Sequence, residues 1–294
     1  MTWPQRYIRQ HELLANHTSF RIGGPAEWFA EPSSLDELVE VLRVASQQGL
    51  PVSVLGGGTN TLAPDRGIHG LVVHLGGGFR TVDVQDEPGE STVVRCGAAL
   101  LTQRLVSLGA QYGWGDVEAF AGLPGQIGGA VVMNAQDIGR FIQCVNLVTL
   151  DGTVLECSRE QLQFGYRYTA LEPGIVAEVV LRFQKVPVQE AQQRVHQALA
   201  YRNNTQEVRL PSAGCAFKNP PSIGAGRLID QAGLKGSRIG DAQVSQRHAN
   251  FIVNLGHATC DDVLSLMEHI QRRVRATFNV MLEPEVRVIG ERRR

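Results

Sequence analysis

The sequence predicts an α+β fold with more than one domain, on three observations. The chain has 294 residues, 43% of them hydrophobic, which is enough for more than one core, since a domain commonly needs about 150 residues. Predicted strands dominate up to residue 184, and longer helical patterns follow. The tripeptide Lys185-Val186-Pro187 separates these regions. We therefore place a domain boundary there.

The N-terminal region is expected to form a strand, a helix and a second strand. The expected elements are a strand at 27–30, a helix at 35–45 and a strand at 51–55. Ser34 and Glu37 have the spacing of a capping box, and Gly49 suits the position after the helix end. The second strand leads into a glycine-rich loop at 56–60. This unit is a suitable platform for a ligand.

The middle of the chain is rich in predicted strands. The expected elements are strands at 70–75, 80–84 and 91–96, a helix at 100–109, and strands at 145–150, 153–157 and 175–184. Asp151-Gly152 is a turn signal between two of these strands. The stretch 119–130 is apolar but interrupted by glycine and proline.

The last third combines helices with one long loop. The expected elements are a polar helix at 189–203, a loop at 211–224, a short helix at 227–233, an amphipathic helix at 261–278 and a strand at 285–289. The amphipathic helix has a stripe formed by Val263, Leu266, Met267, Ile270 and Val274. We divide the chain into residues 1–70, 71–185 and 186–284, with the final strand, 285–294, as a candidate to return to the first part.

Composition excludes several functional classes. The net charge is −1, from 28 basic and 29 acidic residues, which argues against a nucleic-acid-binding protein. The five cysteines show no C-x-x-C spacing, so we expect neither a metal site nor a disulfide framework, and a reducing cytoplasm is the expected compartment. The chain has no apolar run long enough to span a membrane, and residues 1–6 open no apolar stretch of the kind expected of a signal peptide.

Two glycine-rich segments are candidates for ligand binding. The first is Gly56-Gly57-Gly58-Thr59-Asn60, whose backbone N–H groups could bind phosphate. It matches neither the dinucleotide fingerprint nor the P-loop, so a plain tight turn is an equal alternative. The second is 121–134, which contains Gly122, Pro124, Gly125, Gly128, Gly129, Ala130 and Asn134. A helix would not be expected to hold so many helix breakers. Together the segments suggest a large nucleotide cofactor.

Three further segments hold residues suited to catalysis. Arg167 lies between Tyr166 and Tyr168, either stacked at the surface or held to bind a carboxylate or oxyanion. Cys215 is either a small buried apolar residue or a proton donor. Glu285 is either an ordinary residue at the start of a strand or a rigidly held acid. His248 is expected to be structural or to make a polar contact.

Taken together, these segments resemble the UDP-N-acetylenolpyruvoylglucosamine reductase family. The matching pieces, in family order, are Asn16–Ala26, Gly56–Asn60, Ala121–Asn134, Tyr166-Arg167, Cys215–Pro220, Ile229–Gly233, Arg238–Gly240, Val244–Asn254 and Leu282–Gly290. They cover nearly the whole chain, and their number and order make the resemblance specific. No long tyrosine-bearing insertion is present in the last domain, so the chain is similar to the shorter class of the family.

The resemblance implies a fold and two redox partners. The fold is a two-lobed FAD-binding region of the vanillyl-alcohol-oxidase type, with lobes at 1–70 and 71–185, followed by an α+β substrate domain. FAD is the implied cofactor, held by the two glycine-rich segments, and NADPH is the implied reductant. The implied reaction reduces the enolpyruvyl ether of UDP-N-acetylglucosamine enolpyruvate to UDP-N-acetylmuramate, in peptidoglycan precursor synthesis.

The resemblance also implies roles for single residues. The family's catalytic arginine and glutamate fall on Arg167 and Glu285, and Tyr166, Lys218 and Asn219 fall at positions that contact the nucleotide-sugar. The family's proton donor is usually a serine, and here that position is Cys215. Hydride would then reach C3 of the ether from reduced flavin, and a proton would reach C2 from the Cys215 thiol.

Two other functions remain open at this point. One is a flavoprotein of the same fold that oxidises a sugar or an alcohol. The other is a non-catalytic nucleotide- or flavin-binding module, which would explain the glycine-rich segments but not Arg167, Cys215 and Glu285. We expect a monomer or a weak oligomer.

Overall fold

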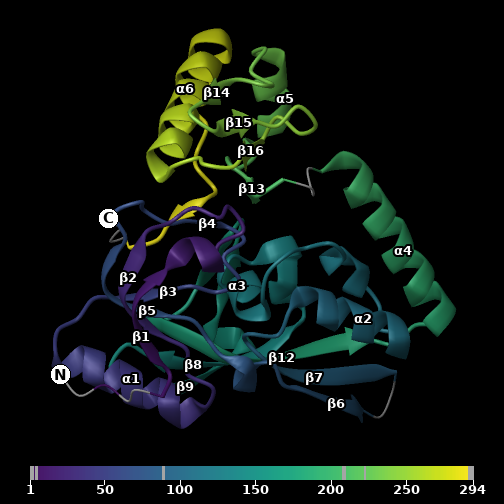
Figure 1. Cartoon of the computed structure of the whole chain (residues 1–294). Helices are drawn as coiled ribbons and strands as arrows, with labels where there is room; N and C mark the ends of the chain where they lie inside the picture. Colours follow the sequence, from purple (N-terminus) through teal and green to yellow (C-terminus); the bar gives the residue numbers. More distant parts are fainter. Residues whose placement is uncertain (1–2, 4–5, 88–89, 207–209, 222, 291–294) are drawn as a thin grey trace. The chain divides into compact units, whose positions relative to one another are not determined.

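The computed structural model describes residues 3, 6–87, 90–206, 210–221 and 223–290 (Figure 1). The helices are α1 (Leu35–Gln47), α2 (Thr102–Tyr112), α3 (Ile127–Val132), α4 (Val188–Thr205), α5 (Ala225–Gln231) and α6 (Cys260–Phe278), with 3-10 helices η1 (Leu14–His17), η2 (Gly77–Phe79), η3 (Val117–Phe120), η4 (Ala135–Arg140) and η5 (Arg159–Gln161). The strands are β1 (Ile8–Leu13), β2 (Pro25–Ala30), β3 (Val52–Val54), β4 (Thr61–Leu62), β5 (Ile68–Val73), β6 (Val82–Glu87), β7 (Ser91–Gly97), β8 (Ile142–Thr149), β9 (Val154–Ser158), β10 (Gln163–Gly165), β11 (Tyr168–Ala170), β12 (Gly174–Gln184), β13 (Ser212–Cys215), β14 (Arg238–Ile239), β15 (Ala242–Val244), β16 (Phe251–Asn254) and β17 (Arg287–Val288).

The strands form three larger sheets and two small ones. The strand orders of the larger sheets are β1-β2-β5-β3, β6-β7-β12-β8-β9 and β13-β16-β15-β14. The second and third are antiparallel throughout. The small sheets are the hairpin β10-β11 and the parallel pair β17-β4. The mixture of strands and helices is the α+β content that the sequence predicts.

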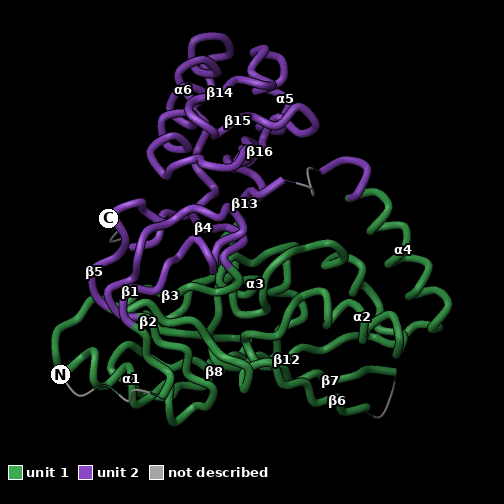
Figure 2. Tube along the Cα trace, in the orientation of Figure 1, with its two compact units in different colours: residues 1–9, 29–57, 71–202 green, residues 10–28, 58–70, 203–294 purple. Residues whose placement is uncertain are grey.

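The chain divides into two compact units (Figure 2). The first unit comprises residues 1–9, 29–57 and 71–202, and the second comprises residues 10–28, 58–70 and 203–294. Segments far apart in the sequence therefore belong to the same unit. In particular, the second unit groups residues 10–28 and 58–70 with the C-terminal third.

Helix α1 begins as predicted, with one difference in its cap. Ser34 Oγ accepts a hydrogen bond from Glu37 N at 3.2 Å. The carboxylate of Glu37, however, accepts from Ser33 N at 2.7 Å instead of from Ser34 N, so the reciprocal half of the predicted capping box is wrong by one residue. The helix buries Leu38, Val41, Leu42 and Ala45 on one face.

The core of the first unit is built around β12. This strand pairs with β7 on one side and β8 on the other, and it is a nearly continuous apolar run, as expected for a central strand. Its buried residues are Ile175, Val176, Ala177, Val179, Val180, Leu181 and Phe183. Phe183 stacks on the buried Trp114, with ring centroids 5.4 Å apart. The predicted strand at 175–184 is thereby confirmed.

Helix α6 supplies much of the core of the second unit. The predicted stripe is confirmed, because Val263, Leu266, Met267, Ile270 and Val274 are all buried. Thr259 and Asp262 form a reciprocal capping box at its start. The carboxylate of Asp65 also accepts from Cys260 N, with 2.8 Å to the nearer oxygen. This negative charge satisfies an orphan donor and complements the helix dipole.

Asp65→Ala is expected to lower the free energy of unfolding by about 1 kcal/mol, the usual effect of removing a helix cap. Urea denaturation followed by circular dichroism measures it. Asp83→Ala is the matched control, because Asp83 is exposed on β6 and its carboxylate accepts, among the described residues, only from the Gln85 side chain. An unchanged urea midpoint for Asp65→Ala would contradict a stabilising role.

The glycine-rich segment 121–134 and the predicted C-terminal strand also differ from the sequence prediction. The glycine-rich segment contains the short helix α3, although its breakers argued against one. Close packing accounts for the glycine at 128, because a Cβ there would lie 2.9 Å from the Ala98 Cβ. The predicted strand at 285–289 is reduced to the two residues of β17, whose parallel partner is β4. Residues 291–294 of the predicted final strand lie outside the described residues.

Candidate active site

Gly56 and Gly57, which begin the first glycine-rich segment, meet the second segment within the first unit. A Cβ built on Gly57 would lie 3.0 Å from Gly125 Cα and 3.5 Å from Gln126 N, and one on Gly56 would lie 3.6 Å from Gln126 Oε1. The loop after β3 thus lies directly against the loop before α3. A side chain at Gly57 would crowd Gly125, whereas a Cβ at Gly56 would make only an ordinary contact with the Gln126 side chain.

The same loops present backbone donors. Within the described residues, no hydrogen bond uses the backbone N–H of Gly56, Gly57, Gly125 or Gly129. A Cβ on Gly129 would meet no atom within 4 Å. Gly128 and Ala130, in contrast, donate to Ala98 O and Gln126 O, at 2.8 and 3.0 Å, so they serve the packing of α3. The remaining donors suit a ligand with anionic or carbonyl oxygens.

Gly58 packs against the segment 16–26 in the second unit. Gly58 has φ 64°, and a Cβ there would lie 2.0 Å from His17 O, so only glycine fits. Ser19 N donates to Gly58 O at 3.1 Å, and Ser19 Oγ donates to Ser212 O at 2.6 Å. This serine connects the Gly58 turn to β13, the strand that ends at Cys215.

Cys215 and Glu285 lie on neighbouring stretches of backbone. Phe217 and Pro284 form an antiparallel bridge, and Glu285 N donates to Ala216 O at 2.8 Å. Lys218 N donates to Glu283 O at 2.8 Å. Both candidate catalytic residues are partly buried. The structure therefore places the segment that follows Cys215 alongside Glu285, although 70 positions separate the two residues in the sequence.

Asn60 supports the Glu285 segment. Its side-chain Nδ2 donates to Glu285 O at 3.2 Å, and its carbonyl accepts from Arg287 N at 3.1 Å. Thr59, next to it, is partly buried. The structure gives Asn60 a part in holding the backbone of Glu285, a role that the sequence prediction of cofactor binding did not include.

The predicted substrate residues Lys218 and Asn219 follow Cys215 directly. Lys218 Nζ forms an ion pair with Glu283. Asn219 Oδ1 accepts from Ala225 N at 3.0 Å, at the start of α5. These contacts fix the loop that the two residues occupy.

Asn250 is a residue whose role sequence reasoning missed. It is 2% exposed. Its Oδ1 accepts from Phe217 N at 3.0 Å, its Nδ2 donates to Phe217 O at 2.8 Å, and its carbonyl accepts from Ala216 N at 2.7 Å. Only the polar asparagine inside the apolar run 249–253 could have signalled this role. Asn250 thus fixes the strand that carries Cys215.

Asn250→Ala is expected to lower the free energy of unfolding by about 1–3 kcal/mol, because both Phe217 backbone groups lose a buried partner. Thermal or urea denaturation measures the loss. Asn204→Ala, at an exposed position of α4, is the control. Equal stability of the two variants would contradict the role given to Asn250.

The predicted polar contact of His248 is confirmed. Its Nδ1 accepts from Asn250 N at 3.3 Å, and its ring lies edge-on to Phe251, with centroids 4.7 Å apart. Burial lowers the pKa of His248 below its usual value, and the charge of Lys235 lowers it further. The folded protein therefore favours neutral imidazole.

This lowered pKa gives a signed prediction for stability. Below a pH of about 6.5 the unfolded chain protonates His248 more readily than the folded chain does. Wild-type stability relative to His248→Asn should therefore fall as the pH is lowered from about 7.5 to about 5. Urea denaturation at several pH values measures it, and a difference independent of pH would contradict the assignment.

Arg167 belongs to the first unit, in the turn of the β10-β11 hairpin. Its φ is 59°, and its guanidinium carbon lies 5.6 Å from the centre of the Tyr166 ring. Arg202, from the last turn of α4, is a second cation nearby. Burial lowers the pKa of Arg202, and the charge of Arg167 lowers it further. Two guanidinium groups that repel each other in this way favour an anion beside them.

Arg202 also contacts the second glycine-rich segment. A Cβ on Gly122, whose φ is 73°, would lie 2.9 Å from Arg202 Cδ. Sequence reasoning treated residues 189–203 as a polar helix and missed this arginine, because its neighbours lie far away along the chain. Tyr166, at 58% exposure, is open to solvent.

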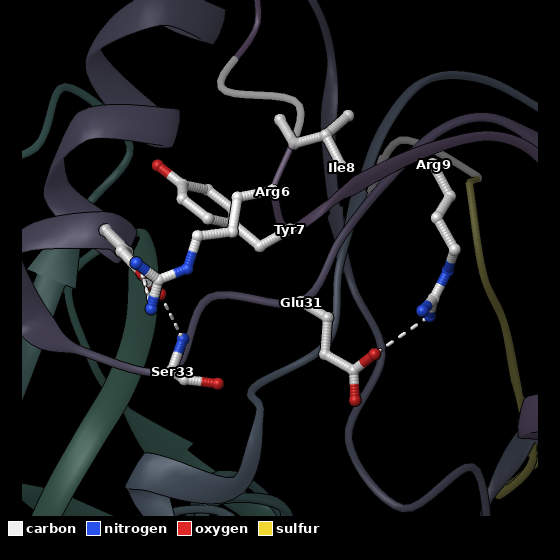
Figure 3. A pocket seen from close by; sticks show the side chains of 7 residues that line it. Arg6, Tyr7, Ile8, Arg9, Glu31 and Ser33 are labelled. Carbon is white, nitrogen blue, oxygen red and sulfur yellow. Dashed lines mark hydrogen bonds and ion pairs between the residues drawn. The ribbon is translucent and has the colours of Figure 1, made fainter.

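A surface hollow of about 340 Å³ lies elsewhere in the first unit, lined by residues including Arg6, Tyr7, Arg9, Glu31 and Glu37 (Figure 3). Arg9 pairs with Glu31 at 2.9 Å and Arg6 with Glu37 at 3.6 Å. Burial, and a hydrogen bond to a glutamate, raise the pKa of Tyr7. The charges in this hollow neutralise one another, and none of the predicted site residues lines it.

Two negative findings apply to the described part of the chain. No helix there is long and apolar enough to cross a membrane. In the same residues, no group of three or more His, Cys, Asp or Glu side chains is arranged to hold a metal ion.

Two domain families match this chain, and they define its class of protein. Residues 26–158 match the FAD binding domain, and residues 206–289 match the UDP-N-acetylenolpyruvoylglucosamine reductase C-terminal domain. The chain is thus an FAD-binding oxidoreductase. The predicted combination of an FAD-binding region of the vanillyl-alcohol-oxidase type and a C-terminal α+β domain is confirmed.

Full-length relatives define the family. The chain is 41% identical to UDP-N-acetylenolpyruvoylglucosamine reductase 2 of Symbiobacterium thermophilum, over 96% of this chain and 92% of that protein. It is 37% identical to the Bacillus subtilis reductase, over 97% and 95%. The crystal structure of the Thermus caldophilus reductase matches with a TM-score of 0.81 and 38% identity, over 96% of this chain and 99% of that one. The chain belongs to the UDP-N-acetylenolpyruvoylglucosamine reductase family, and the resemblance drawn from its motifs is confirmed.

The residues of the first unit fit FAD. The two adjoining glycine loops leave backbone N–H groups for its diphosphate and ring carbonyls, and Gly129 leaves open space above α3. Larger side chains at Gly56 or Gly57 would fill this cradle. The prediction of FAD as cofactor therefore agrees with both the domain match and the local geometry.

Proposed function

We propose that this protein catalyses the NADPH-dependent reduction of UDP-N-acetylglucosamine enolpyruvate to UDP-N-acetylmuramate, in the cytoplasm and for peptidoglycan precursor synthesis. Membership of the reductase family supports the substrate class. The observation that supports the proposal is the backbone pairing of Ala216 and Phe217, which follow Cys215, with Glu285 and Pro284. A binding module would need neither residue.

FAD, when bound and reduced by NADPH, supplies the hydride that C3 of the enolpyruvyl ether accepts. Gly56, Gly57, Gly122, Gly125 and Gly129 are the residues proposed to hold it. Gly58, Thr59 and Asn60 continue the first of these loops, and Pro124 lies within the second.

Arg167 and Glu285 are proposed to stabilise the charge that hydride addition creates. Addition at C3 leaves negative charge at C2, and this charge spreads into the adjacent carboxylate. The Arg167 guanidinium, a rigid planar donor, binds that carboxylate. Glu285, when protonated, donates a hydrogen bond to it. Such fixed donors lower the barrier because they need no reorganisation during the reaction.

Cys215 is proposed to complete the reaction as a general acid. Its Sγ–H bond breaks, a C–H bond forms at C2, and the thiolate regains its proton from water before the next turnover. One hydride added at C3 and one proton added at C2 together make the two-electron reduction of the double bond.

Lys218, Asn219 and Tyr166 are proposed to contact the nucleotide-sugar.

The visible spectrum of the pure protein tests this function. We expect the absorption of bound oxidised flavin, its loss on anaerobic addition of NADPH, and its return on addition of the enolpyruvyl ether. A sugar or alcohol oxidase of the same fold would instead be reduced by its sugar or alcohol and reoxidised by air. A colourless protein that cannot be loaded with FAD would overturn the proposal.

A further inference from the structure

The strands of the hairpin that carries Arg167 are too short to make the hairpin stable by themselves. β10 and β11 have three residues each and form a separate two-stranded sheet. Isolated hairpins are marginally stable. Arg167, in the turn, also has the left-handed φ of 59°, which is uncommon for a residue with a side chain. The orientation of the Arg167 guanidinium therefore depends on contacts outside the hairpin.

The segment around Asn134, in the same unit, contacts both strands of the hairpin. Asn134 Nδ2 donates to Gly165 O at 3.0 Å, and its Oδ1 accepts from Gly139 N at 3.0 Å. On the other strand, Thr169 Oγ1 donates to Val131 O at 2.5 Å. One hydrogen bond thus holds each strand of the hairpin, next to the turn.

Close packing adds a third contact. A Cβ built on Gly139 would lie 2.4 Å from Cδ1 of the Phe164 ring. The absence of a side chain at Gly139 allows the Phe164 ring to lie directly on η4. The hairpin is therefore fixed at Phe164, Gly165 and Thr169, on both sides of Arg167.

The backbone of the supporting segment is itself unusual. Asn134, Gln136 and Asp137 have φ values of 42°, 52° and 57°. Left-handed conformations are unfavourable for residues with a Cβ, and they persist where the surrounding structure requires them, often at functional sites. Asparagine tolerates this conformation better than most residues.

The hydrogen-bonding groups of the Asn134 side chain are used within the protein. The second Nδ2 hydrogen faces Asp137 Oδ1 at 3.3 Å, so both amide hydrogens and the Oδ1 already have partners. This leaves the amide no donor for a cofactor, although the sequence placed Asn134 among the cofactor-binding residues.

We propose that Asn134 is a positioning residue for Arg167, acting through the carbonyl of Gly165, with Thr169 as the second anchor. The inference rests on the proposed function, because it takes Arg167 to be the group that binds the substrate carboxylate. Loss of Asn134 then displaces the guanidinium and leaves the flavin site intact.

Asn134→Gly and Thr169→Val test the proposal in separate half-reactions. Glycine keeps the left-handed backbone, and valine keeps the shape of threonine. We expect unchanged FAD affinity and unchanged flavin reduction by NADPH, with flavin reoxidation by the enolpyruvyl ether slowed by up to about 100-fold, as for a misplaced catalytic group. Asn146→Ala, which removes an asparagine hydrogen bond to Glu178 at 3.0 Å in the same unit, should leave both half-reactions unchanged.

A double-mutant cycle with Arg167→Ala separates the possible failures. If Asn134 acts through Arg167, Asn134→Gly adds no further slowing in the Arg167→Ala background. Additive slowing, weaker FAD binding by Asn134→Gly, or normal reoxidation in both single variants would overturn the inference. Normal reoxidation by Arg167→Ala itself would instead overturn the function proposed for Arg167.

Discussion

Cys215→Ala is expected to keep normal flavin reduction by NADPH and to lose turnover of the enolpyruvyl ether by about 10²–10⁴-fold, the usual contribution of a general acid. The loss follows because alanine has no proton to give to C2 after hydride addition. Stopped-flow absorbance under anaerobic conditions measures the two half-reactions separately.

Cys215→Ser is the conservative partner of this experiment. Serine can donate a proton from the same position, so this variant should retain much of the activity that alanine loses. Cys157→Ala, a partly buried cysteine on β9, should leave both half-reactions unchanged. Full turnover by Cys215→Ala would show that another group delivers the proton.

Arg167→Ala is expected to slow reoxidation by the enolpyruvyl ether by about 10²–10³-fold, as the loss of one preorganised oxyanion donor commonly does. Arg167→Lys should recover only part of this loss, because a lysine ammonium replaces the planar fork with a single point of charge. Single-turnover rates at saturating substrate measure the effect on the chemical step.

Arg140→Lys is the matched control for Arg167→Lys. Arg140 also lies over an aromatic ring, with its guanidinium carbon 4.7 Å from the centre of the Phe141 ring, and it is exposed on η4. A general effect of losing an arginine–aromatic contact would slow both variants. Equal rates for Arg167→Lys and Arg140→Lys would remove Arg167 from the proposed mechanism.

Sequence patterns predicted the elements that depend on residues close together in the chain. The stripe of α6, the Ser34 cap and the apolar run of β12 follow from spacing over a few residues, and the structure contains each of them. The strands of the sheet β13-β16-β15-β14 were missed, because they are two to four residues long and carry little periodicity.

Contacts between distant segments could not be read from spacing. Asn250 bonds a residue 33 positions away and Asp65 one 195 positions away, and neither is marked by its own neighbours in the sequence. Glycine and proline predicted that 121–134 is unusual, but not that Gly128 serves helix packing while Gly129 stays open. The family resemblance supplied Arg167, Cys215 and Glu285 as a set, and the structure pairs Ala216, the residue after Cys215, with Glu285.

Anaerobic reoxidation of the NADPH-reduced protein by UDP-N-acetylglucosamine enolpyruvate most directly tests the proposed reaction. We expect one equivalent of the ether to restore the oxidised flavin spectrum and to be converted to UDP-N-acetylmuramate. Flavin that stays reduced in the presence of the ether, and recovers only when air is admitted, would contradict it.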